Sequence, residues 1–300
     1  MSERSAYVNE SGGHPVPAVL AGVDGSPQST AAAHWAAGEA RLRGVPLRLV
    51  HAWPWLTDGE SAFAEPDDLP AAAQRVLAAA AGEVRERHPG LEVRTDGVLD
   101  APVDGLVAAA ADTDLLVLGS RGRGGFTGLL LGSVSMAAAA RSSVPVVVVR
   151  EPGTAGGGDG PEVVVGVDAQ DPQDEVLAFA FREAALRGAR VRAVHGWDLP
   201  PVFGYAGGAV PATEIAQLEA LEAKLLSLAV AAERERHPGT AVVEDVRLGA
   251  ARGLVDASAG AALVVVGRRH RSIEFGPRLG RVAHAVLHHA QAPVAVVPHG

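Results

Sequence analysis

The two halves of the chain repeat each other, and this duplication constrains the fold more than any other feature of the sequence. The matching segments are AVLAGVDGSP (18–27) with VVVGVDAQDP (163–172), LRLVHAW (47–53) with VRAVHGW (191–197), RERHPG at 85–90 and 234–239, DLLVLGSRG (114–122) with ALVVVGRRH (262–270), and SVPVVVVR (143–150) with QAPVAVVPH (291–299). Their order is the same in both halves, and the spacing between partners changes only in the middle. The pattern predicts one domain fold present twice, with an insertion in one copy.

The segment between the two repeats sets the predicted domain boundaries. Residues 151–161, EPGTAGGGDGP, are rich in glycine and typical of a flexible linker. We therefore expect a flexible N-terminal tail over 1–15, a first domain over 16–150, this linker, and a second domain over 162–300. A chain of 300 residues with 48% hydrophobic content is long enough to bury two separate cores.

Within each repeat, short valine-rich runs alternate with longer alanine-rich stretches of helical periodicity. In the first repeat the expected strands are 18–23, 47–52, 91–99, 115–118 and 145–149, and the expected helices are 29–43, 70–88, 103–111 and 133–141. Continuous apolar strands joined by helices predict a mostly parallel sheet that is covered on both faces. Each half is therefore expected to be a five-stranded, doubly wound, Rossmann-like α/β domain, with ligands at the carboxyl ends of its strands.

Composition excludes several classes of function. The formal net charge of −9 argues against a general nucleic-acid-binding surface. The absence of cysteine excludes disulfides and thiol catalysis, and it is typical of a reducing compartment such as the cytoplasm. The N-terminus lacks the basic-then-apolar pattern of a signal peptide, and no apolar run is long enough for a membrane span. We expect a cytoplasmic protein without membrane or nucleic-acid partners.

A glycine-rich stretch, GSRGRGGFTGLLLGSVS, follows the fourth predicted strand of the first half. Gly119, Gly122 and Gly132 are followed by Ser133, while Asp24 closes the first strand at the same edge of the sheet. Glycines permit positive φ and close backbone approach, and Ser133 could cap the next helix and direct its first amides at an anion. The pattern therefore has two interpretations, a purely structural loop or a cradle for a phosphate chain. Neither the Walker A pattern nor the dinucleotide fingerprint is present.

The spacing Gly-2x-Gly-9x-Gly-Ser over residues 119–133 resembles the universal stress protein family, whose ATP-binding members carry G-2x-G-9x-G-(S/T). The resemblance covers essentially the whole chain as two tandem copies. It implies that Asp24 contacts the adenine or ribose end of ATP and that Ala52 lies against the base. It further implies that the ribose and phosphates are held by a group of motif residues, namely Gly119, Gly122, Gly132, Ser133 and the amides of Val134 and Ser135. Arg121 and Arg123 in the same loop have two interpretations, added charge for the phosphates or solvated side chains. Magnesium would be held chiefly through the phosphates, because no paired carboxylates flank the loop.

The second copy departs from this motif. The residues at the corresponding positions are Asp168, Gly196, Gly267, Arg269, Gly280 and Arg281. His270 replaces the second glycine and Arg281 replaces the hydroxyl residue. A non-glycine residue in a left-handed conformation costs roughly 1–2 kcal/mol, and a lost hydroxyl bond to phosphate costs about 1.5–3 kcal/mol, although the added arginines bind phosphate well. We expect a weaker or different second site.

The resemblance implies an ATP-binding regulator of the stress response that acts through its conformation or its partners. Weak ATP hydrolysis stays open, although the sequence offers no strong general base. Two alternatives stay open as well, an ATP-using enzyme of the nucleotide-binding α-hydrolase group and an interaction module without nucleotide. In the family, the terminal strands pair between domains. We therefore expect the strands within 143–150 and 291–299 to pair and to join the two halves as an internal pseudo-dimer. We also expect two copies of the whole chain to form a homodimer.

Overall fold

The computed structural model describes six stretches of the chain, residues 17–54, 68–122, 131–150, 161–198, 211–269 and 279–300. The predicted N-terminal tail, the predicted linker apart from Pro161, and loop residues 123–130 and 270–278 lie outside them.

The described strands are β1 (Val19–Gly22), β2 (Leu47–Trp53), β3 (Val93–Leu99), β4 (Leu115–Gly119), β5 (Val146–Val149), β6 (Glu162–Val167), β7 (Arg190–Trp197), β8 (Val242–Leu248), β9 (Leu263–Arg269) and β10 (Val294–His299). The described helices are α1 (Pro27–Arg43), α2 (Asp68–Arg87), α3 (Pro102–Ala110), α4 (Ser133–Arg141), α5 (Asp174–Arg187), α7 (Ala212–Arg236), α8 (Ala250–Ala257) and α9 (Arg281–His289). We call β1 to β5 with their helices half one, and β6 to β10 with theirs half two.

Within the described residues, the two halves form a single 10-stranded sheet in the order β3-β2-β1-β4-β5-β10-β9-β6-β7-β8. Strands inside each half are parallel, whereas β5 and β10 pair antiparallel, with Val147 opposite Ala295. This confirms the predicted doubly wound α/β fold in two tandem copies. The expected pairing of the terminal strands between the halves is also present.

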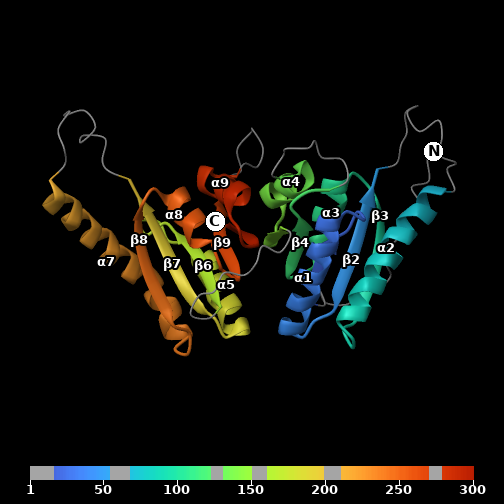
Figure 1. Cartoon of the computed structure of the whole chain (residues 1–300), viewed down its shortest axis with the longest axis horizontal. Helices are drawn as coiled ribbons and strands as arrows, with labels where there is room; N and C mark the ends of the chain where they lie inside the picture. Colours follow the sequence, from blue (N-terminus) through green and yellow to red (C-terminus); the bar gives the residue numbers. More distant parts are fainter. Residues whose placement is uncertain (1–16, 55–67, 123–130, 151–160, 199–210, 270–278) are drawn as a thin grey trace.

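The central strands of the sheet are buried on both faces, as continuous apolar strands require, whereas the edge strands β3 and β8 are partly exposed. Every residue of β1, β4 and β5 is buried. Helices α1, α2, α5 and α7 contribute to the core on one face, and α3, α4, α8 and α9 to the core on the other (Figure 1). The two layers leave the carboxyl ends of the strands as the edge where a ligand can approach each half.

Helix α1 has a start and an end that its sequence explains. Ser26 caps it by accepting a hydrogen bond from the Ser29 amide at 3.2 Å, and Pro27 occupies the first turn, where its missing N–H costs nothing. Gly44 ends the helix with φ 68°, a left-handed conformation that favours glycine. Its counterpart Gly188 ends α5 in the same way, with φ 58°.

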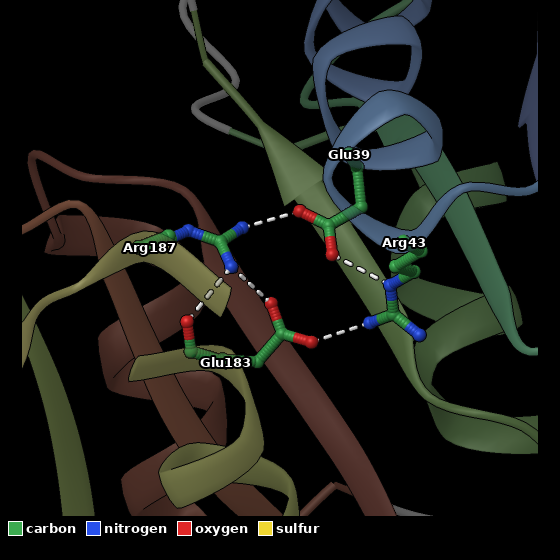
Figure 2. Close-up of polar contacts among 4 residues, drawn as sticks. All are labelled: Glu39, Arg43, Glu183 and Arg187. Atoms are coloured by element: carbon green, nitrogen blue, oxygen red, sulfur yellow. Dashed lines mark hydrogen bonds and ion pairs between the residues drawn. The ribbon is translucent and has the colours of Figure 1, made fainter. Parts of the chain in front are cut away.

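Helices α1 and α5 meet between the halves through four buried charged side chains, Glu39, Arg43, Glu183 and Arg187 (Figure 2). Each arginine bonds the glutamate of its own helix and the glutamate of the other, with Arg43 Nε 2.6 Å from Glu39 Oε1. The glutamate side chains are at most 1% exposed and the arginine side chains at most 11%. We call these four residues the ion quartet. It joins equivalent positions of the two repeats, 144 residues apart.

The ion quartet predicts an unusual pH dependence of stability. Burial, together with the nearby Glu39 carboxylate, raises the pKa of Glu183 above its ordinary value of 4.5, against the opposing effect of Arg43 and Arg187. The folded chain therefore binds this proton more tightly than the unfolded chain, so the contribution of Glu183 to stability is present in acid and is lost as pH rises through the raised pKa.

Glu183→Gln should remove this slope. Free energies of unfolding in urea, measured for both proteins from about pH 4.5 to about pH 8, give the difference between wild type and variant. We expect that difference to fall as the pH rises. A difference that grew with pH, or stayed constant, would contradict the raised pKa.

Candidate functional site

The carboxyl ends of β1 and β4 bring the predicted site residues of half one together. Gly119, the last residue of β4, packs on the first turn of α1, because a Cβ there would lie 2.7 Å from the carbonyl carbon and oxygen of Gln28 and 3.0 Å from the Ser29 nitrogen. A side chain at this position would push the strand away from the helix. Gly119 therefore sets the distance between β4 and the chain segment that carries Asp24.

Asp24 lies directly against Gly122. Its Oδ1 accepts a hydrogen bond from the Ser26 amide at 2.9 Å, and a Cβ on Gly122 would lie 2.5 Å from its Oδ2. Of the two properties expected of the motif glycines, positive φ and close approach, the structure shows only the second. None of Gly119, Gly122 and Gly132 has a positive φ. At Gly119 a Cβ would meet backbone atoms, whereas at Gly122 it would meet the Asp24 carboxylate, which would have to move.

The N-terminus of α4 lies beside this pair. Gly132 is the N-cap, with φ −78° and ψ 151°, and its amide donates to Ser120 O at 2.7 Å. The expected capping by Ser133 is wrong, because Ser133 is the first helical residue and no side chain caps the helix. First-turn amides of a helix have no intrahelical acceptor, so those of Ser133, Val134 and Ser135 are suited to an anion.

The other predicted residues of half one have more varied surroundings. The Ser135 hydroxyl donates to Gly119 O at 2.6 Å, so this side chain ties α4 to β4 and leaves only its amide for a ligand. Ala52 is half-buried in β2 and Arg121 is exposed. His51, the residue before Ala52, has Nδ1 2.6 Å from Val23 O and stacks on Trp53. Arg123 lies outside the described residues.

Half two contains a cavity of about 840 Å³ at the corresponding edge of the sheet, a size within the range of small-molecule sites. All six positions expected for the second site line it, namely Asp168, Gly196, Gly267, Arg269, Gly280 and Arg281. Gly196 is required by close approach, since a Cβ there would lie 2.0 Å from the Cα of Ala250 in α8. His270 lies outside the described residues, so its effect on the site stays a prediction.

The cavity lining includes one polar pair that the motif did not indicate, beside the expected arginines. His195, only 4% exposed, has Nδ1 2.9 Å from Val167 O and Nε2 3.0 Å from Oε2 of Glu222 in α7. Arg269 pairs with Asp171, and the exposed Arg281 is the first residue of α9. One sequence signal could have found Glu222. The repeat RERHPG aligns α7 with α2, and this alignment places Ala73 at the position of Glu222.

In the described part of the chain, no group of three or more histidines and carboxylates is placed to hold a metal ion. None of the described helices is long and apolar enough to span a membrane.

Comparison with known proteins gives a consistent result. The family model described as the universal stress protein family matches residues 16–150 and again 161–298. A universal stress protein of Mycobacterium tuberculosis is 35% identical over 292 residues, which cover 93% of this chain and 96% of that protein. One of Mycolicibacterium smegmatis is 32% identical over 295 residues, with coverage of 93% and 96%. The crystal structure of a universal stress protein from Archaeoglobus fulgidus shares the fold, with a TM-score of 0.69 at 20% identity over 94% of this chain and 98% of that one.

Proposed function

The chain belongs to the universal stress protein family, and we propose that it is an ATP-binding regulator in which the nucleotide controls conformation or partner binding during stress. The observation that carries this proposal is the contact between Asp24 and Gly122 beside the N-terminus of α4. An acidic side chain and a set of amide donors on one edge of the sheet match the two ends of a nucleotide. The donors favour phosphate, and the carboxylate accepts hydrogen bonds from ribose hydroxyls or the base.

In half one, the amides of Ser133, Val134 and Ser135 would hold the phosphates, aided by the Ser133 hydroxyl and the Arg121 guanidinium. Gly119, Gly122 and Gly132 would let the chain approach the nucleotide, and Asp24 with Ala52 would contact the nucleoside. Because the sequence has no paired carboxylates beside the loop, Mg²⁺ would be held through the phosphates of the bound ATP.

In half two, we assign the cavity of about 840 Å³ as a second, weaker nucleotide site. Arg281 stands where half one has the Ser133 hydroxyl, and Arg269 already pairs with Asp171. A paired arginine must break an existing interaction before it can bind phosphate, which lowers its net contribution. We also propose that two copies of the chain, each already an internal pseudo-dimer, associate as a homodimer. A cytoplasmic location is part of the proposal as well, and the absence of cysteine supports it.

The test is to purify the full chain without added ligand, extract bound nucleotide, and titrate the protein with ATP and Mg²⁺ by calorimetry. We expect co-purified ATP or saturable ATP binding. Recovery of AMP or another processed product would indicate the ATP-using enzyme instead. A protein without bound nucleotide and without saturable ATP binding would overturn the proposal in favour of an interaction module.

A further inference from the structure

The two halves differ in charge at the end of the site where the base is assigned. Glu222 lines the cavity of half two, whereas the aligned position in half one is the buried Ala73. Asp198 also lines this cavity, and its counterpart in half one is Pro54. Half two therefore has two carboxylates, Glu222 and Asp198, that half one lacks. Both halves also have the aspartate that follows their first strand, Asp24 in half one and Asp168 in half two.

Glu222 is fixed in the cavity wall. Its side chain is 12% exposed, and its Oε2 lies 3.0 Å from His195 Nε2, which is itself anchored through Nδ1 to Val167 O. For Oε1, the structure shows no hydrogen-bond donor within the described ranges. Helix α7 thus presents a carboxylate that is oriented by one partner and retains acceptor capacity for a ligand.

The same cavity also contains cationic groups and helix amides. Arg269 lies at the end of β9, and Arg281 and Gly280 form the N-terminus of α9. The lining thus combines groups that can bind phosphate with the carboxylates of Asp168, Asp198 and Glu222, while Asp171 pairs with Arg269. A ligand that fits this arrangement carries an anionic tail and a head that donates hydrogen bonds.

The two purine bases differ in this respect. Guanine offers adjacent N1–H and N2–H donors, which one carboxylate can accept together, whereas adenine offers one amino group beside the acceptor N1. An acceptor that faces a carboxylate is repelled, so such a wall rejects adenine as well as attracting guanine. On the basis of the proposed nucleotide function, we propose that the cavity of half two prefers guanine nucleotides to adenine nucleotides, with Glu222 as the specificity-determining residue.

The test uses the full chain and three proteins, the wild type, Glu222→Ala and Glu235→Ala. Glu222→Ala installs the residue of half one, and Glu235 is an exposed glutamate on the same helix that serves as the matched control. Each protein is titrated with GTP and with ATP, both with Mg²⁺, by calorimetry. We expect Glu222→Ala to weaken GTP binding at the half-two site about tenfold, because a two-bond base contact discriminates by roughly that factor or more. ATP binding at the same site should become stronger, because the carboxylate that repels adenine N1 is gone. Glu235→Ala should match wild type for both nucleotides.

A charge-only variant, Asp198→Asn, provides a second measurement that does not depend on how the Glu222 variant folds. It should also weaken GTP more than ATP. Equal effects on GTP and ATP in both variants, or none, would overturn the guanine preference while leaving ATP binding intact. If the wild type bound neither GTP nor ATP, the proposed nucleotide-binding function itself would fail. The experiment therefore distinguishes failure of the guanine preference from failure of the proposed function.

Discussion

Replacing Glu183 with alanine is expected to lower the free energy of unfolding by about 3–5 kcal/mol at neutral pH, because it leaves buried charges of the ion quartet without a partner. Glu183 is fully buried and bonds both Arg43 and Arg187. Its loss leaves two arginine side chains, each at most 11% exposed, to share Glu39 alone. Urea unfolding monitored by circular dichroism measures the change directly.

The control is an ion pair on the surface. The side chains of Arg252 and Asp256, on α8, are 88% and 55% exposed, and Arg252 Nε lies 3.8 Å from Asp256 Oδ2. Asp256→Ala should therefore lower the free energy of unfolding by less than about 1 kcal/mol. A third variant, in which apolar residues of similar volume replace all four members of the ion quartet, should recover much of the lost stability. Our interpretation fails if Glu183→Ala is no more destabilising than Asp256→Ala.

The fold could be predicted because its signals are local. Apolar runs and alanine-rich periodicity gave the strands and helices of half one, and the duplication extended them to half two. Differences are confined to element ends. Helix α1 begins at Pro27 rather than at residue 29, because the cap at Ser26 lies before the apolar periodicity starts. The strand predicted from residue 91 begins at Val93.

The ion quartet was not predicted, because its contacts depend on the register of β5 against β10. A charged residue on an alanine-rich helix is ordinarily exposed, and periodicity alone gives no reason to bury Glu39. A signal was nevertheless present, since the pattern Glu-3x-Arg-Gly occurs at 39–44 and again at 183–188. Duplicated charges at equivalent positions indicate a contact across a pseudo-twofold axis once the halves are known to pair.

The glycine spacing and Asp24 were predicted to lie at one edge of the sheet, and the structure brings them together there; that this edge binds a ligand stays a prediction. Of the two reasons given for the glycines, positive φ is wrong for the three motif positions, whereas close approach of neighbouring groups applies to Gly119 and Gly122. Spacing cannot distinguish backbone freedom from close approach. Glu222 was missed for another reason, because it reaches the cavity of half two from α7, far in sequence from the glycine motif.

Gly122→Ala is expected to weaken ATP binding at half one by about 10- to 100-fold, the loss that corresponds to one or two hydrogen bonds to a charged group. The added methyl group would lie 2.5 Å from Asp24 Oδ2, a distance that requires the carboxylate to move. Asp24 cannot move freely, because its Oδ1 is bonded to the Ser26 amide at 2.9 Å. The substitution therefore displaces the group assigned to the nucleoside and leaves the amides of α4 in place.

Calorimetric titration of the full chain with ATP and Mg²⁺ resolves a tighter and a weaker class of site. In Gly122→Ala, the tighter class, which we assign to half one, should be lost or weakened. Gly82→Ala is the matched control, because a Cβ at this helical glycine meets no atom within 4 Å, and it should bind ATP like wild type. Because Gly122 acts through Asp24, the double variant Asp24→Ala/Gly122→Ala should bind ATP no more weakly than Asp24→Ala alone. If the losses of ATP affinity in the two single variants add up in the double variant, Gly122 contacts the nucleotide independently of Asp24. If Gly122→Ala binds ATP with unchanged affinity, half one is not the principal site.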